Sequence, residues 1–147
     1  MNDKFFMDSN ILIYTFDSQT PHKQEKAREL VATALSTQNG IISFQVVQEF
    51  LNVATRKFET PLTSQEAEKY INQVLTPLCE VFANMELYIK AVQIMKRWQY
   101  SFYDSLIIAA ALQAKCKILY SEDLQHGQVI ESTLTIQNPF QTDENKK

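Results

Sequence analysis

Glycine is scarce in this chain of 147 residues: the only two are Gly40 and Gly127, far apart in the sequence. A phosphate-binding P-loop and a dinucleotide-binding G-x-G-x-x-G motif each need clustered glycines, so neither is present. Cysteine is equally scarce. Cys79 and Cys116 form no C-x-x-C pair, and we interpret them as small buried residues rather than as a disulfide or a thiolate ligand pair.

Long hydrophobic runs are also missing. No apolar stretch reaches the roughly 18 residues that a membrane-spanning helix needs. The start of the chain, Met1 to Lys4, is not followed by the apolar segment of a signal peptide, so we expect a cytoplasmic protein. The two histidines, His22 and His126, share no ligand spacing, which makes a zinc site or a general-base role a minor alternative.

The net charge is −3, whereas proteins that bind nucleic acids usually carry a basic surface. Bound cations would change this balance. Two divalent ions held by four carboxylates would bring the formal sum from −3 to +1. The global charge therefore does not exclude RNA or DNA as a partner.

Against this background, four acidic residues each adjoin an apolar segment. They are Asp8, Glu49, Asp104 and Asp123. Carboxylates beside core segments are costly unless they are paired or bound to a metal, and several of them close together repel one another. The pattern therefore predicts a shared site for a hard divalent cation.

Short apolar runs bounded by polar residues predict buried strands, and helical patterns lie between them. We expect strands near residues 4–7, 40–43, 79–82, 117–121 and 133–136. We expect helices over residues 21–37, from 63 to near 77, 86–99 and 103–114. Strands separated by helices indicate an α/β domain with a mainly parallel sheet of about five strands. We assign residues 1–140 to this single domain and residues 141–147 to a flexible tail.

Ligands bind beyond the carboxyl ends of parallel strands, where Asp8 and Asp123 should meet. Each acid also has a simpler explanation. Asp8 could cap a helix that starts at Ile11, Asp104 could cap its own helix or favour its positive end, and Asp123 could be a turn residue. Glu49 is harder to explain in this way, because it projects from an apolar helical face where unpaired carboxylates are rare.

Four segments of the chain together resemble the motifs of PIN domains, in the same order. The segments are Phe5–Tyr14, Gln45–Phe50, Ser101–Ile107 and Tyr120–Gly127. The resemblance covers residues 5 to about 140. Within this family, the chain most resembles the VapC-type toxins of bacterial toxin–antitoxin pairs. It implies a three-layer α/β/α sandwich and a magnesium-dependent ribonuclease. It also implies that Asp8, Glu49, Asp104 and Asp123 form the acidic quartet, with Asn10 as the polar companion of the first acid.

The chemistry open to such residues can be stated independently of the resemblance. Mg²⁺, for which we expect Mn²⁺ to substitute, prefers oxygen ligands and can activate water for in-line attack on phosphorus. We assign Asp8 and Asp104 to a primary ion, Asp123 to that ion or to a second one, and Glu49 to a ligand or water-positioning role. Ser43 and Ser121 could support the carboxylates by hydrogen bonds, although serines at strand ends are more often turn or cap residues.

The resemblance implies an RNA substrate, a cognate antitoxin and pairing of two copies of the chain. The abundance of large apolar residues also favours a homodimer. The alternatives are a catalytically silent PIN module that binds RNA or protein, and a nuclease for routine RNA processing. A haloacid-dehalogenase-type phosphatase would need an acid where Asn10 stands. A receiver domain would need one after a middle strand, where the chain has Phe82, Ala83 and Asn84.

Four aromatic residues near the third motif could stack on unpaired bases, although packing in the core or a dimer is the more common use. They are Trp98, Tyr100, Phe102 and Tyr103. The basic pairs Arg56–Lys57 and Lys96–Arg97 are candidate phosphate contacts. Such pairs late in helices also follow from the helix dipole alone.

Overall fold

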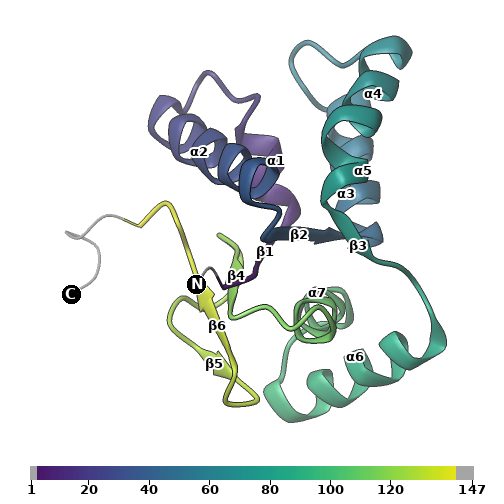
Figure 1. Ribbon diagram of the computed structural model, residues 1–147, viewed down its shortest axis with the longest axis vertical. Helices are drawn as coiled ribbons and strands as arrows, with labels where there is room; N and C mark the ends of the chain where they lie inside the picture. The colour runs from purple at the N-terminus through teal and green to yellow at the C-terminus, as the bar shows by residue number, and fades with distance from the viewer. Residues whose placement is uncertain (1–2, 142–147) are drawn as a thin grey trace.

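A computed structural model describes residues 3–141 and contains a six-stranded sheet in the order β3-β2-β1-β4-β6-β5 (Figure 1). The strands are β1 (Phe5–Met7), β2 (Gly40–Ser43), β3 (Cys79–Val81), β4 (Ile118–Tyr120), β5 (Val129–Ile130) and β6 (Leu134–Gln137). All neighbouring strands are parallel except β5 and β6, which are antiparallel. The prediction of a mainly parallel sheet is confirmed. The additional strand β5 has only two residues, too few to produce a recognisable apolar pattern.

Helices cover both faces of this sheet and complete the predicted three-layer sandwich. They are α1 (Ser9–Tyr14), α2 (Pro21–Thr37), α3 (Phe44–Arg56), α4 (Ser64–Tyr70), a π-helical turn η1 (Ile71–Leu75), α5 (Thr76–Leu78), α6 (Met85–Trp98) and α7 (Phe102–Gln113). In Figure 1, α6 and α7 lie together below the sheet, and the other helices lie above it. No helix of residues 3–141 has both the length and the apolar character needed to cross a membrane.

Local sequence signals explain where several helices begin. The Thr63 hydroxyl accepts a hydrogen bond from Glu66 N, and the Glu66 carboxylate accepts one from Thr63 N. This reciprocal pair is the expected capping box, which satisfies two amides that the helix itself leaves free. From there, the chain remains helical through η1 to Leu78, close to the predicted end near residue 77. Pro21 opens α2, where its fixed φ and missing amide hydrogen are tolerated.

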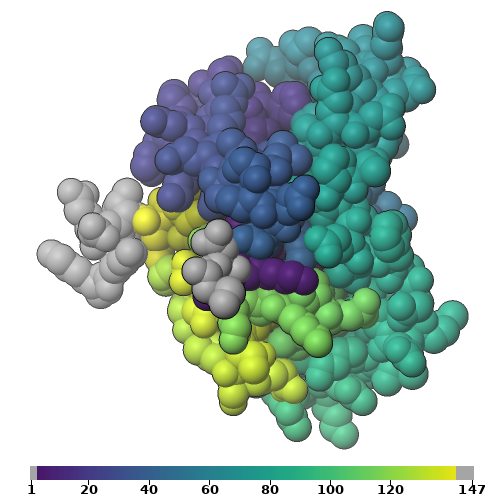
Figure 2. Space-filling model, viewed as in Figure 1, coloured from purple at the N-terminus to yellow at the C-terminus, as the bar shows by residue number. Residues whose placement is uncertain are grey.

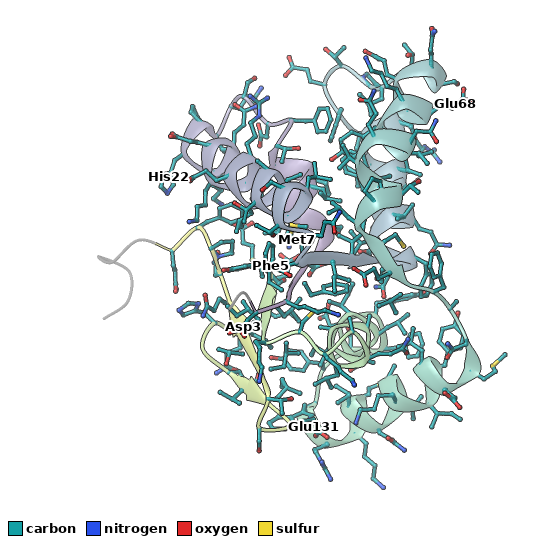
Figure 3. All side chains as sticks on the ribbon, in the orientation of Figure 1. Asp3, Phe5, Met7, His22, Glu68 and Glu131 are labelled. Atoms are coloured by element: carbon teal, nitrogen blue, oxygen red, sulfur yellow. The ribbon has the colours of Figure 1, made fainter. Side chains whose placement is uncertain are left out.

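The core lies between the sheet and the two helical layers. Phe6 and Met7 of β1 have no exposed surface, and Figure 3 shows Met7 near the centre of the molecule. Helix α7 is buried from Ser105 to Ala111, as its uniformly apolar sequence predicts. Helix α2 approaches β2 so closely that a Cβ on Gly40 would lie 2.1 Å from Ala34 Cβ. In Figure 2, the C-terminal segment in yellow lies at the surface, while the helical segments in blue and teal cover the upper and right parts of this face.

The chain order of the strands defines where a ligand crevice is expected. From β1, the chain adds β2 and then β3 on one side, and it returns to place β4 on the other side of β1. This reversal makes the carboxyl ends of β1 and β4 a topological switch point, the usual site of a ligand crevice in an open α/β sheet. Of the predicted tail, Gln141 is described, and its amide donates to Asn138 O. Residues 142–147 lie outside the described part of the chain.

Candidate active site

Asp8 is the first residue after β1 and stands at this switch point. Its amide donates to Tyr120 O over 3.0 Å, which extends the pairing of β1 with β4. Its carboxylate accepts a hydrogen bond from Ser9 N over 2.7 Å and caps α1, which begins two residues before the predicted Ile11. The side chain is buried, with only 7% of the residue exposed. Asp8 is therefore both a helix cap and a buried acid at the carboxyl edge of the sheet.

Ser121 connects Asp8 to Asp123. The Ser121 hydroxyl donates to Asp8 Oδ2 over 2.8 Å and accepts a hydrogen bond from Asp123 N over 3.1 Å. Ser121 itself is fully buried, whereas Asp123 is exposed. One hydroxyl group thus orients a buried carboxylate and the backbone of an exposed acid at the same time.

Asn10, the predicted companion of Asp8, contacts the fourth acid rather than the first. Its amide nitrogen donates to Asp123 Oδ2 over 3.1 Å, and its oxygen accepts from Glu122 N over 3.4 Å. These two contacts hold α1 against the segment that follows β4. Asn10 therefore helps to hold the side chain of Asp123 in place.

A residue that the sequence analysis did not select connects Glu49 to the first turn of α7. Gln45 is buried, and its Nε2 donates to Glu49 Oε2 over 3.3 Å and to Tyr103 O over 3.2 Å. Tyr103 directly precedes Asp104 in the first turn of α7. The sequence does contain a signal for this contact: Gln45 and Glu49 are four residues apart, which places them on the same helix face. Ser101, not Asp104, caps α7, since its hydroxyl accepts from Asp104 N over 3.2 Å.

The surroundings of Asp8 disfavour its ionised form. Burial is the main cause and raises the pKa of Asp8 from 3.8 to about 7, although the hydrogen bonds from Ser121 and Ser9 lower it. The negative charges of Glu49 and Asp123 raise the pKa of Asp8 further, which places both acids within electrostatic range. Three of the four predicted acids are thus coupled. For the fourth, Asp104, the described contacts show only that Gln45 joins Glu49 to the backbone of the preceding residue, Tyr103.

Ser43, predicted to support the carboxylates, makes no such contact. It ends β2, is fully buried, and its hydroxyl has no hydrogen-bond partner among the described residues. The same is true of the Ser105 hydroxyl and of Gln45 Oε1. These three atoms lie at the carboxyl end of β2 or near the start of α7. Among the described residues, one other buried side-chain atom lacks a partner, Gln141 Oε1, which lies after β6.

The candidate ligand atoms at this edge suit a hard divalent cation. They are carboxylate, hydroxyl and amide oxygens, the ligands that Mg²⁺ prefers, and an ionised Asp8 in a buried position needs a compensating positive charge. Within residues 3–141, no three acidic, histidine or cysteine side chains lie close enough to form a complete ligand set in their present positions. Asp8, Glu49 and Asp123 are the residues whose charges already interact and which could hold such an ion.

A second polar cluster, also absent from the sequence analysis, holds the segment after β4 in place. Tyr14 donates a hydrogen bond to Glu122 Oε1 over 2.6 Å, and Lys23 forms an ion pair with the same carboxylate. The Lys23 ammonium lies 4.9 Å from the centre of the Tyr14 ring. Because Glu122 precedes Asp123, this cluster fixes the acidic segment against α1 and α2.

These features define a class: a three-layer α/β domain with a buried aspartate after its first strand and further acids around the carboxyl edge of the sheet. The sequence model of the PIN domain matches residues 5–130. The chain belongs to the PIN domain family. Among curated proteins, no sequence matches it significantly.

Several solved structures have a similar fold, among them a toxin–antitoxin complex and a toxin. A toxin–antitoxin complex from Klebsiella pneumoniae has a TM-score of 0.64 and 16% identity, covering 92% of this chain and 98% of that one. FitAcB from Neisseria gonorrhoeae has a TM-score of 0.63 and 16% identity, with 94% and 99% coverage. VapC20 from Mycobacterium tuberculosis, a toxin that cleaves the sarcin–ricin loop, has a TM-score of 0.55 and 15% identity, with 82% and 90% coverage. At these identities, the similarity establishes a shared fold.

Proposed function

We propose that this protein is a magnesium-dependent endoribonuclease of the VapC type. The observation that supports the proposal most directly is the buried Asp8 at the end of β1, held by Ser121 and electrostatically coupled to Glu49 and Asp123, in a chain of the PIN domain family. The substrate in this proposal is single-stranded or looped RNA, and cleavage leaves 5′-phosphate and 3′-hydroxyl ends. Mn²⁺ is expected to replace Mg²⁺.

When bound, Mg²⁺ supplies Lewis acidity, which acidifies water and offsets the negative charge that develops on the phosphate. The chain's own residues position the ligands. Ser121 and the amide of Ser9 orient the carboxylate of Asp8, and Asn10 holds Asp123. Gln45 holds Glu49 near the first turn of α7, where Asp104 lies, so Glu49 is suited to orient a water molecule. No side-chain nucleophile is required.

The comparisons support the biological part of the proposal. VapC20 is a toxin that cleaves the sarcin–ricin loop, and another structural neighbour is a toxin–antitoxin complex. We therefore propose that this chain acts on RNA in the cytoplasm and is inhibited by a cognate antitoxin. We also propose that it forms a homodimer, which the exposed apolar residues of α6 favour.

The test is cleavage of a structured RNA with Mg²⁺, with Mn²⁺ and with excess EDTA. Activity should require the metal and should be lost in Asp8→Asn, Asp104→Asn and Glu49→Gln. Glu68→Gln is a matched control, because Glu68 is exposed on α4, far from the site (Figure 3). Full activity in EDTA, or wild-type turnover of the Asp8→Asn variant, would contradict the proposal.

The same assays distinguish a metal-dependent nuclease from a catalytically silent binding module. The module would bind RNA or a protein with no cleavage in Mg²⁺ or Mn²⁺. A nuclease for routine RNA processing would cleave RNA without arresting growth when it is expressed alone. Growth arrest that an antitoxin encoded beside this gene relieves would support the toxin role.

A further inference from the structure

A pocket of about 440 Å³ lies beside the acidic site, between α3, α6 and α7. The residues that line it are Phe44, Gln45 and Gln48 of α3, Tyr88 of α6, and Phe102, Tyr103 and Leu106 of α7. None of the lining residues carries a charge. A pocket of this composition suits a neutral ligand with a flat apolar face and a few polar groups.

Gln45 joins this pocket to the acids. Its side chain lines the pocket, and its Nε2 donates to Glu49 Oε2 and to Tyr103 O. Because both partners can only accept, the orientation of the amide is fixed, and Oε1 remains an acceptor with no partner among the described residues. The pocket therefore adjoins the Glu49 carboxylate through Gln45, a residue that is only 4% exposed.

Tyr103 is the most exposed aromatic residue of the described chain, with 66% of its surface accessible. Its ring contacts Phe102 edge to face, with ring centres 5.4 Å apart and an angle of 73° between the planes. Phe102 in turn lies 6.5 Å from Tyr88. Phe102 and Tyr88 pack against the core, whereas a ring as exposed as Tyr103 has little part in core packing. Tyr103 thus presents a large aromatic surface one residue before Asp104.

We propose that this Tyr103 pocket binds one unpaired nucleobase of an RNA strand whose adjacent phosphate lies at the acidic site. The base stacks on Tyr103, and the exposed amide of Gln48 hydrogen-bonds to its edge. This inference rests on the proposed function and deepens it. It explains a preference for looped or single-stranded RNA, because a base can enter the pocket only when it is unpaired and unstacked from its neighbours.

Binding can be measured apart from cleavage with the Asp8→Asn variant and short single-stranded RNAs that carry 2-aminopurine at successive positions. Stacking on Tyr103 should quench the fluorescence at one position. The double variant Asp8→Asn with Tyr103→Ala should lose the quenching and bind the RNA about tenfold more weakly or worse. Asp8→Asn with Tyr103→Phe should keep both the quenching and the affinity. Phe82→Ala is the matched control, because Phe82 is 64% exposed and does not line the pocket. RNA binding without quenching at any position would overturn the inference.

Cleavage by the otherwise wild-type protein provides the second measurement. Tyr103→Ala should raise KM about tenfold or more while leaving the Mg²⁺ dependence unchanged, and Gln48→Ala should change which base is preferred next to the cut. If the wild type cleaves RNA and both variants keep its KM and base preference, the pocket is not the base site, although the proposed function stands. If the wild type cleaves nothing but Tyr103→Ala still abolishes quenching, the base site is supported and the nuclease proposal fails.

Discussion

The Ser121 hydroxyl lies 2.8 Å from Asp8 Oδ2 and donates a hydrogen bond to it in the interior of the protein. This contact couples the end of β4 to the end of β1, two positions 113 residues apart in the sequence. It also lowers the pKa of Asp8, in opposition to the effect of burial. The pair is therefore a point at which folding and the chemistry of the acidic site can be tested together.

Replacing Ser121 by alanine should raise the pKa of Asp8 further and move the pH–rate profile of cleavage to higher pH. It should also lower the free energy of unfolding by about 1–3 kcal/mol, because Asp8 Oδ2 and Asp123 N both lose a partner. Urea denaturation and a pH series of initial rates would measure these effects. Ser43→Ala is the matched control: it removes a buried hydroxyl that has no partner among the described residues. Ser43→Ala should lower the free energy of unfolding clearly less than Ser121→Ala does. Equal decreases would contradict the assigned role of Ser121.

The raised pKa of Asp8 should make the metal-free protein less stable as the pH increases. The folded pKa of about 7 exceeds the ordinary value of 3.8, so the folded state holds the proton more tightly than the unfolded state. Protonation of Asp8 therefore stabilises the folded state by about 4 kcal/mol. This stabilisation is fully present below about pH 3.8 and is lost as the pH rises to about 7.

Denaturation in EDTA at several pH values would measure this loss, with Asp8→Asn as the comparison. The asparagine variant lacks the titrating group, so its stability should fall less over the same range, and at pH 8 it should be more stable than the wild type. Mg²⁺ should stabilise the wild type at pH 8 more than the variant, because the ion offsets the charge of Asp8. Parallel pH curves for the two proteins would show that Asp8 is not the group responsible.

Converting Asn10 to aspartate should disrupt the site without changing the size of the side chain. The present amide donates to Asp123 Oδ2, whereas a carboxylate would accept only and would repel Asp123. We expect cleavage to fall at least tenfold at pH 7.5 and the apparent Mg²⁺ affinity to change. The fold should persist, because Asn10 is only partly buried. Unchanged kinetics would show that the position of Asp123 does not depend on Asn10.

Strong local patterns explain why most of the fold could be predicted. The capping box at Thr63, the apolar sequence of α7 and the short apolar strands each identify an element from neighbouring residues alone. The π-helical turn at Ile71–Leu75 and the two-residue strand β5 escape this reasoning. Both are short departures from the regular periods of helices and strands, with no composition of their own.

The acids could be selected from the sequence because each is an unexpected charge beside an apolar segment. Their partners could not be assigned in the same way. Gln45 and Lys23 resemble any polar residues of helices, and only the packing of α3 against α7, or of α2 against the segment after β4, shows what they contact. Ser121 and Ser43 both stand at strand ends, yet only the first reaches a carboxylate. Sequence pattern identified the charges, whereas tertiary contacts determine how they are held.

The proposed homodimer should depend on the outer face of α6. Met85, Ile89 and Val92 are 75%, 59% and 53% exposed and recur at helical spacing, so they form one apolar stripe. Light scattering at micromolar concentration should give a dimeric mass for the wild type and a monomeric mass for Ile89→Lys. Val129→Lys is the control, because Val129 is also exposed but lies on β5. A monomeric wild type would exclude the dimer, and a dimeric Ile89→Lys variant would place its interface elsewhere.

Magnesium and the proposed antitoxin should compete at the acidic site. An antitoxin segment that lies across the carboxyl edge of the sheet could reach Asp8 and Asp104 with an arginine or lysine side chain. A guanidinium or ammonium group satisfies carboxylates that otherwise need a cation, so it would occupy the same oxygens as the metal.

Titration calorimetry of the antitoxin at increasing Mg²⁺ concentrations should therefore show progressively weaker binding. Asp8→Asn combined with Asp104→Asn should weaken the antitoxin and remove its dependence on Mg²⁺, while apolar contacts elsewhere preserve part of the affinity. Glu68→Gln serves again as the distant control. Antitoxin affinity that stays constant both in the double variant and across the magnesium series would place inhibition outside the acidic site.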